Sequence, residues 1–268
     1  MPRTRGGVDG NGDRARAGVD LNSDVGEGFG PWRMGDDAAM LDIVTTANIA
    51  CGFHAGDPLI MARTVAMAVE RGVRVGAHPG YNDLWGYGRR RVSGDAPADI
   101  ATMVLYQVGA LSAIAAREGC VLSHVKLHGA LSNVAAEDEE LAAAIGAAIR
   151  DTDPRLAWLV PAGSAMVAVG ERLGVRTVSE VFADRGYDSS GNLLPRSQPG
   201  ALVDDPAAVA RRAVRMVREG MVSASGTDVP LRAESICVHG DTRGAVELAS
   251  AVRRALEGAA LAVRPFAT

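Results

Sequence analysis

The chain has 268 residues, enough for one large domain or two small ones, and its apolar fraction of 47% is typical of a soluble globular protein. The net charge is −4 and no basic stripe with interleaved aromatic side chains is present, so the sequence argues against nucleic-acid binding. No uninterrupted apolar run approaches ~18 residues, so the sequence also predicts no membrane-spanning helix and no membrane partner.

The chain ends and the cysteines bear on domain organisation and location. Residues 1–18 are rich in Gly, Arg and Asp and have no apolar core, so we expect a disordered N-terminal tail rather than a secretory signal. Cys51, Cys120 and Cys237 lack metal-ligand spacing and are typical of free thiols in a reducing cytoplasm, where we expect the protein to reside. Residues 19–268 show no domain boundary and no internal repeat, so we expect a single domain there.

From residue 19 onward, short β-rich runs alternate with amphipathic, Ala-rich stretches. The predicted strands are residues 19–22, 45–51, 73–78, 123–128, 157–161, 177–183 and 235–239. The predicted helices are residues 36–44, 58–71, 97–118, 138–150, 164–173, 205–219 and 243–257, and residues 221–233 predict a small hairpin. This α/β pattern favours a parallel sheet closed or nearly closed as a TIM-like barrel, with a doubly wound open sheet as the alternative.

Residues 123–128 form a predicted strand whose two faces differ. Because side chains alternate on a strand, His124, Lys126 and His128 share one face, while Val125 and Leu127 take the other. Basic groups are costly to bury without partners, so the first face suggests a lined cavity. Lys126 is also the only lysine among 28 Lys and Arg residues, which indicates a need for a compact, tunable ammonium. The alternative is a lysine paired with a carboxylate inside a core network.

Polar residues gather where the predicted strands end. They are Asp24 and Glu27 after the first strand, His54 and Asp57 after the second, His78 on the third, Lys126 and His128 on the fourth, Glu180, Asp184 and Arg185 on or after the sixth, and His239 and Asp241 at the seventh. The active site of a parallel α/β barrel lies at this end of the strands. A single histidine there is about as often structural, but the joint placement of so many predicts an active site.

The residue types favour carbonyl chemistry on a small charged molecule. Carboxylates suit the role of base or orienting group, and histidines with a pKa near neutrality suit proton transfer. The Lys126 ammonium suits the stabilisation of a negative oxygen. Two long Gly- and Arg-rich loops carry Arg89, Arg90, Arg185 and Arg196, which suit a bidentate clamp on a carboxylate or phosphate, with a solvated surface as the alternative.

A metal site is one of two interpretations of the strand ends. Asp24, His54 and His78 come from three neighbouring predicted strands and would match an Asp-His-His set for zinc or another divalent ion. They lack the helical spacing of a strong metal motif, so a metal-free site is the other interpretation. Cys51 and Cys237 are better explained as small side chains packed in strands than as nucleophiles. No P-loop is present, so ATP would need another mode of binding.

Short motifs along the chain, taken together, resemble the LamB/YcsF family. They are residues 20–28 (DLNSDVGEG), 47–57 (ANIACGFHAGD), 76–79 (GAHP), 86–90 (GYGRR), 125–129 (VKLHG), 181–187 (VFADRGY), 195–198 (PRSQ) and 237–241 (CVHGD). The resemblance covers nearly the whole chain from residue 19. It implies a distorted (β/α)7 TIM-like barrel of the glycoside hydrolase and deacetylase type.

The resemblance also implies an activity. Members of this family form the A subunit of an ATP-dependent 5-oxoprolinase, a hydrolase that opens the lactam of 5-oxo-L-proline to L-glutamate together with B and C partner subunits. We therefore expect ATP with Mg²⁺, bound either by the partner subunits or by this chain, and 5-oxo-L-proline as substrate. The resemblance does not decide whether a divalent metal binds at the barrel mouth or whether the chain forms a homo-oligomer. Phosphorylation of the lactam oxygen would give an imidate-like centre that an activated water can attack.

The resemblance sorts the strand-end residues into two expected sets. The catalytic set is Asp24, Lys126, His128 and Asp184, with Asp24 or His128 as the base and Lys126 stabilising a negative oxygen. The substrate- or phosphate-binding set is Asn22, Glu27, His54, His78, Arg89, Arg185, Arg196 and His239, with Arg185 or Arg196 holding a carboxylate or phosphate. The chain departs from the family at Leu127, where most members have Pro, and at Ser132, where most have Tyr. The second departure bears on the identity of the substrate.

Two other functions are compatible with the sequence. A metal-dependent deacetylase acting on carbohydrate amides is suggested by the Asp-His-His set and by the fold that the resemblance implies. A non-catalytic, substrate-binding subunit of a complex is the other, although the density of titratable groups at the strand ends argues against it.

Overall fold

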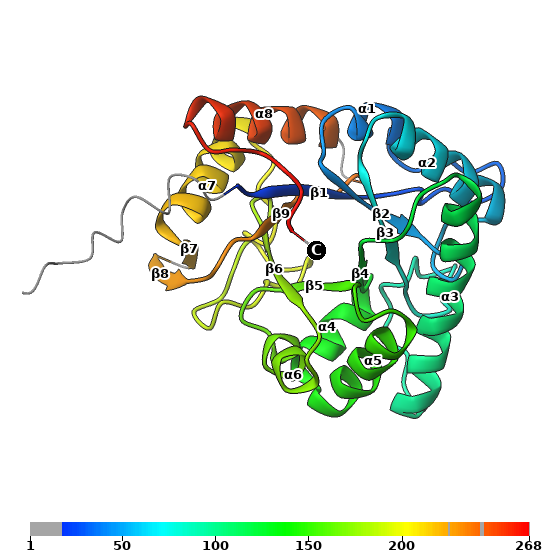
Figure 1. The fold of residues 1–268 in the computed structure, drawn as a ribbon. Helices are drawn as coiled ribbons and strands as arrows, with labels where there is room; N and C mark the ends of the chain where they lie inside the picture. The colour runs from blue at the N-terminus through cyan, green and yellow to red at the C-terminus, as the bar shows by residue number, and fades with distance from the viewer. Residues whose placement is uncertain (1–17, 225, 242–243, 268) are drawn as a thin grey trace, which may run out of the picture.

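The computed structural model describes residues 18–224, 226–241 and 244–267. Seven parallel strands close into a barrel in the order β1-β2-β3-β4-β5-β6-β9, with β9 pairing back to β1 (Figure 1). These strands are β1 (Asp20–Val25), β2 (Thr46–Ala50), β3 (Arg74–His78), β4 (His124–Lys126), β5 (Ala157–Pro161), β6 (Thr177–Phe182) and β9 (Ser235–Cys237). The predicted hairpin is present as the antiparallel pair β7 (Met221–Ala224) and β8 (Thr227–Pro230).

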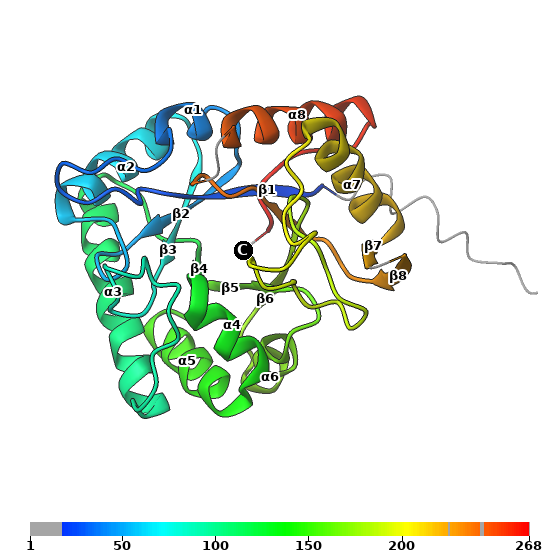
Figure 2. The same cartoon turned by 180° about the vertical axis from the view of Figure 1, so that it is seen from behind.

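Helices surround the barrel on its outside, as the two opposite views show (Figure 2). They are α1 (Asp37–Leu41), α2 (Pro58–Glu70), α3 (Pro97–Arg117), α4 (Gly129–Glu137), α5 (Glu139–Thr152), α6 (Ala165–Leu173), α7 (Pro206–Glu219) and α8 (Ala245–Gly258). Local sequence fixes several of their starts. The side chains of Asp57 and Asp205 accept hydrogen bonds from the first backbone amides of α2 and α7, and a proline follows each of them.

The TIM-like barrel expected from the alternation of strands and helices is confirmed, and the open-sheet alternative is wrong. β1 is longer than predicted, so Asp24 lies on the strand rather than after it. The sequence does not predict α4, because the Gly, Ser and Asn in its sequence are typical of turns. Its apolar side chains Ala130, Leu131 and Ala135 are buried, and this burial stabilises a helix that begins at Gly129. The expected N-terminal tail falls on residues 1–17, which lie outside the described residues.

Buried polar side chains fill the interior of the barrel below the carboxyl ends of the strands. Asp20 accepts a hydrogen bond of 2.8 Å from the Thr46 hydroxyl, and both side chains are fully buried. The ring of His124 also points into the barrel, where Phe266 from the C-terminal segment packs against it with ring centroids 5.4 Å apart. A Cβ atom on Gly76 would lie 2.2 Å from the His124 ring. Only glycine therefore leaves room for this imidazole between β3 and β4.

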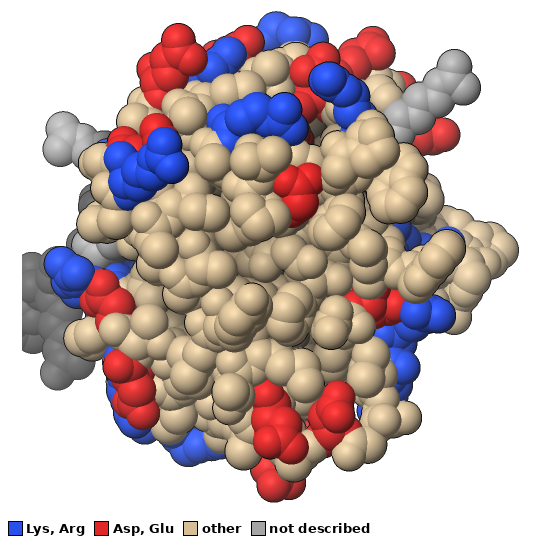
Figure 3. Space-filling view, turned by 90° about the vertical axis from the view of Figure 1, so that its right-hand side faces the viewer, with Lys and Arg blue, Asp and Glu red and all other residues tan. Residues whose placement is uncertain are grey.

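The outer face of α3 is uncharged over most of its length. Residues 100–116 contain no charged side chain. Within the described ranges α3 is the single helix long and apolar enough to cross a membrane by length and composition, although polar residues interrupt its sequence. It packs against α2 and α5 as part of the helical layer around the barrel. Charged side chains lie mainly around the edge of this face and leave its middle uncharged (Figure 3).

Candidate active site

A cavity of about 530 Å³ opens at the carboxyl ends of the barrel strands, where active sites of this fold lie. One group of lining side chains comes from β1, β3, β4 and the segments that follow them, and comprises Asp24, Glu27, His78, Lys126 and His128. A second group comes from β6, β9 and the segments that follow them, and comprises Glu180, Phe182, Arg185, Arg196, His239 and Asp241.

Lys126 is buried and contacts groups from several strands of the barrel. Its Nζ donates a hydrogen bond of 2.8 Å to Asp24 Oδ1 and lies 2.9 Å from Glu180 Oε1. It also lies 3.2 Å from Cys237 Sγ and 3.3 Å from Asn22 Oδ1. An ammonium has three protons to donate, and these four contacts use them all. Lys126 therefore lines the cavity and is also paired with carboxylates in a core network, so both interpretations of the sequence apply.

The opposite charges of this network stabilise each other's ionised forms. Burial alone would lower the pKa of Lys126, but Asp24 and Glu180 hold it well above its usual value. Burial alone would raise the pKa of Asp24, but His78 and Lys126 hold it well below its usual value. At neutral pH the pair is thus an ammonium and a carboxylate. Burial raises the pKa of the Cys237 thiol well above its usual value, so this thiol is not an activated nucleophile.

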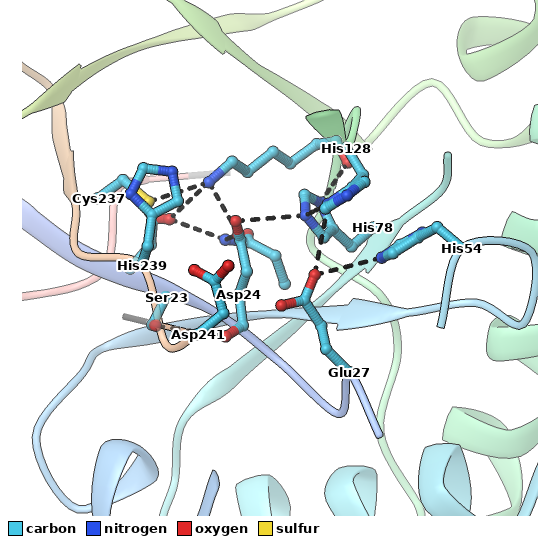
Figure 4. A network of polar contacts seen from close by, with 12 residues as sticks. Ser23, Asp24, Glu27, His54, His78, His128, Cys237, His239 and Asp241 are labelled. Carbon is cyan, nitrogen blue, oxygen red and sulfur yellow. Dashed lines mark hydrogen bonds and ion pairs between the residues drawn. The ribbon is translucent and has the colours of Figure 1, made fainter. Parts of the chain in front are cut away.

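Glu27, His54, His78 and His128 form a buried cluster beside Asp24 (Figure 4). His128 Nδ1 lies 3.0 Å from His78 Nε2 and 3.3 Å from Glu27 Oε1. His54 Nε2 also lies 3.3 Å from Glu27 Oε1, and the His54 ring stacks on the His128 ring with centroids 3.7 Å apart. His78 Nε2 lies 3.3 Å from Asp24 Oδ2, which joins the cluster to the lysine network.

The loop after β3 packs directly on the imidazoles of this cluster. The Tyr87 hydroxyl donates to Glu27 Oε2, and the Tyr87 carbonyl lies 2.8 Å from His128 Nε2. Tyr87 adopts a φ of 54°, in the left-handed region that few non-glycine residues enter. A Cβ atom on the next residue, Gly88, would lie 2.7 Å from the His128 ring. Burial lowers the pKa of His54 and His128 well below the usual value, so both rings are neutral near pH 7.

Two guanidinium groups give another side of the cavity a positive charge. Arg185 donates to the backbone carbonyls of Ala201 at 3.1 Å and Leu194 at 2.6 Å. Burial and then the charge of Arg196 lower the pKa of Arg185. Among the described residues no carboxylate forms an ion pair with Arg185 or with Arg196. Guanidinium groups bind carboxylates and phosphates bidentately, so this part of the cavity suits an anionic group of a ligand.

His239 is held at the cavity by Asp184. The ring lies with Nδ1 2.9 Å from Asp184 Oδ2 and stacks on Phe182 with centroids 5.5 Å apart. Burial alone would raise the pKa of Asp184, but His239 and Arg185 hold it below its usual value. Asp184 is therefore a carboxylate that orients His239.

The structure places most of the predicted site residues around the cavity. Its lining includes Asp24, Glu27, His78, Arg89, Lys126, His128, Arg185, Arg196 and His239. Asn22, His54 and Asp184 are buried behind the lining instead. The ligand contact predicted for Asn22 and His54, and the catalytic role predicted for Asp184, stay predictions, and the contacts in the structure suit positioning roles. Asn22 contacts Lys126, His54 stacks on His128, and Asp184 orients His239.

Several contacts at the site are not predicted by the sequence. Glu180 lies at a predicted strand end without a predicted role, although the two-residue period of β6 places it on the same face as Phe182. Tyr87 carries no sequence signal apart from the glycines on either side of it. Arg90 pairs with the carboxylate of Asp83, with Nε 2.9 Å from Oδ1, and does not line the cavity.

The Asp-His-His metal set predicted from the sequence is not brought together. Two groups of the described side chains lie close enough to share an ion, Glu27, His54, His78 and His128 in one and Asp24, Cys237 and His239 in the other. The predicted set is divided between these two groups, because His54 approaches Glu27 and His128, while Asp24 is held by Lys126.

Comparison with known proteins decides the family. Residues 19–268 match the family model described as the LamB/YcsF family. The chain belongs to the LamB/YcsF family. A relative from Rhodopseudomonas palustris, named as the A subunit of 5-oxoprolinase, is 53% identical over 250 residues, which cover 93% of this chain and 98% of that protein. A relative from Bradyrhizobium diazoefficiens, named as a second 5-oxoprolinase A subunit, is 53% identical over 249 residues, covering 92% and 97%.

A solved structure extends the family likeness to three dimensions. The crystal structure of the lactam utilization protein from Thermus thermophilus is 46% identical to this LamB/YcsF chain, with a TM-score of 0.89. The match covers 93% of this chain and 100% of that one. The family membership expected from the motifs is thus confirmed over almost the full length of both proteins.

Proposed function

We propose that this chain is the A subunit of an ATP-dependent 5-oxoprolinase, which cleaves 5-oxo-L-proline to L-glutamate. The observation that carries the proposal is the 53% identity to a 5-oxoprolinase A subunit over 98% of that protein. The cavity supports it, because one side suits a carboxylate or phosphate and another carries acidic and imidazole groups for chemistry at a carbonyl.

The proposed binding mode uses both sides of the cavity. Arg185 and Arg196 lack a carboxylate partner within the described part of the chain and would hold the ring carboxylate or a phosphate. The lactam carbonyl would then point toward Lys126 and Asp24. Ser132 also lines the cavity at the position where most family members have Tyr, which leaves this part of the wall small.

The proposed reaction opens an amide that resists attack by water alone. Phosphoryl transfer from ATP to the lactam oxygen releases ADP and makes the ring carbon electrophilic. Water then adds to this carbon, and its proton passes to the cluster of Asp24, Glu27, His78 and His128. The C–N bond breaks with the nitrogen leaving as the amine, and a second water hydrolyses the acyl phosphate to glutamate and phosphate. Lys126 keeps Asp24 ionised during these steps.

The proposed complex includes B and C partner subunits, with ATP and Mg²⁺ bound by the partners. The sequence has no P-loop, which supports a nucleotide site outside this chain or of another type. We also propose that the protein works in the cytoplasm, and its three cysteines are free thiols, as that compartment favours.

We propose that a partner subunit docks on the uncharged outer face of α3. Tyr106 on this face is 66% exposed and stacks on Phe53, and Leu59 at the start of α2 is 75% exposed. Depletion of charge and exposed aromatic side chains are typical of the core of an interface. A partner subunit is favoured as the occupant because the relatives are named as one lettered component of a larger enzyme.

Charge placed on this face is expected to prevent assembly. Tyr106→Glu and Ala113→Glu should abolish co-elution with the B and C subunits in size-exclusion chromatography, because each buries a carboxylate in an apolar contact. Ala207→Glu, at the exposed start of α7, is the matched control and should assemble normally. Assembly of the α3 variants as in the wild type would contradict the proposal. If the wild-type chain forms dimers and these variants are monomeric, the face instead binds a second copy of this chain.

The proposed activity is tested by ATP hydrolysis that depends on 5-oxoproline, with glutamate quantified. We expect glutamate in equal amount to phosphate when the chain is mixed with its B and C partners, and none from the chain alone. No glutamate from either sample would reject the proposal. Hydrolysis of a carbohydrate amide without ATP would favour the metal-dependent deacetylase instead.

A further inference from the structure

Two ring nitrogens, His78 Nε2 and His128 Nδ1, face each other at 3.0 Å in the buried cluster (Figure 4). His78 Nδ1 lies 2.8 Å from the Lys126 carbonyl oxygen, which can only accept, so this nitrogen is protonated. His128 Nε2 carries its proton for the same reason and donates it to the Tyr87 carbonyl at 2.8 Å. The ring nitrogens left for each other, or for a cation between them, are therefore His78 Nε2 and His128 Nδ1.

Glu27 adds a third atom to the same place. Its Oε1 lies 3.3 Å from His128 Nδ1, and an ionised carboxylate only accepts. The Tyr87 hydroxyl anchors the other oxygen, Oε2, and so fixes the direction of Oε1. Contacts this short among two ring nitrogens and a carboxylate oxygen are attractive with a cation at their centre, either a proton on one ring or a metal ion.

The spacing of these atoms fits a metal ion. Ligands about 2.0–2.1 Å from a tetrahedral Zn²⁺ lie roughly 3.3 Å from one another. The 3.0 Å between the nitrogens and the 3.3 Å between His128 Nδ1 and Glu27 Oε1 are close to this value. The remaining N–H of each ring is donated to a backbone carbonyl, an arrangement that orients imidazoles for metal binding.

His54 belongs to the cluster but does not fit as a ligand beside His128. The two rings are parallel within 2° and their centroids are 3.7 Å apart. Because the lone pair of an imidazole lies in the ring plane, one ion cannot lie in the planes of two stacked rings. His54 Nε2 is instead placed to donate to Glu27 Oε1 at 3.3 Å, which makes His54 a positioning residue.

We propose that Glu27 Oε1, His78 Nε2 and His128 Nδ1 bind one divalent first-row transition metal ion at the cavity. Three protein ligands leave one coordination position open, which is the pattern of catalytic rather than structural zinc sites. Asp24 Oδ2, 3.3 Å from His78 Nε2, borders the site. A metal there would polarise a carbonyl or activate a water, which deepens the proposed function. Metal binding itself rests on the geometry alone.

Calorimetric titration of metal-free protein with Zn²⁺ tests this site. We expect one ion per chain. Glu27→Gln and His128→Gln should weaken binding at least tenfold, since even the loss of an outer hydrogen-bond partner costs about 10–100-fold. His54→Phe keeps the stacked ring and should still bind one ion per chain. Glu171→Gln, at an exposed position on α6, is the matched control for Glu27→Gln and should bind as the wild type does.

Three results would overturn the proposal: no binding by folded wild-type protein, weaker binding in Glu171→Gln, or a loss in His54→Phe as large as in His128→Gln. Circular dichroism checks that each variant is folded. If the ligand variants unfold, the visible spectrum of wild-type protein loaded with Co²⁺ decides. Intense bands of four-coordinate Co²⁺ support the site, and the weak spectrum of hydrated Co²⁺ rejects it. These measurements count ions and not turnover, so they separate this site from the proposed reaction.

Discussion

Replacing Lys126 with methionine is expected to lower the free energy of unfolding by about 3–5 kcal/mol at neutral pH. Lys126 Nζ lies within 2.9 Å of carboxylate oxygens of both Asp24 and Glu180, and all three side chains are buried. Methionine fills a similar volume but leaves two carboxylates in the barrel without their cation. Urea-induced unfolding of both proteins, followed by circular dichroism, measures the difference.

A second substitution separates lost charge pairing from lost packing. In a Glu180→Gln background, Lys126→Met should lower the free energy of unfolding clearly less, because only one carboxylate then loses its cation. Arg172→Met, which breaks the exposed ion pair with Glu139, is the control and should change stability little. An equal cost of Lys126→Met in both backgrounds would show that Glu180 and Lys126 are not coupled, and would contradict this account of the network.

The inward face of β4 is the part of the site that the sequence specifies best. Strand alternation predicts that His124, Lys126 and His128 share one face. The structure places all three toward the barrel interior or its mouth, with Val125 and Leu127 in the apolar core outside. Two-residue periodicity is a local property, so one strand is enough to read it.

The residues that contact these side chains could not be predicted from the sequence in the same way. Lys126 and Glu180 meet because the barrel closes, so their contact depends on the register of several strand pairs. The stacking of His54 on His128 and the contact of Tyr87 with Glu27 depend on the paths of two loops. Loop paths follow from packing against the finished barrel, and the sequence carries only glycines as a sign of them. The predicted metal set is divided between two groups for this reason.

Replacing Asp24 with asparagine is expected to lower turnover by the complex reconstituted with B and C subunits by about 10²–10⁴-fold, the range for loss of a group that assists proton transfer. The substitution is well matched to the site. Asp24 Oδ1 accepts from Lys126 Nζ and Asn48 Nδ2, both at 2.8 Å, and an amide oxygen can take over both contacts. Oδ2 lies 3.3 Å from His78 Nε2, a contact that the amide group of asparagine can also make.

The asparagine variant should therefore stay folded while losing the negative charge at this position. Asp36→Asn is the matched control, because Asp36 caps α1 through its side chain and asparagine caps helices equally well. Its turnover should equal that of the wild type. A fall in kcat with little change in KM would place Asp24 at the reacting carbonyl. Full turnover by folded Asp24→Asn would remove the Lys126–Asp24 pair from the chemistry and leave it as a structural element of the barrel.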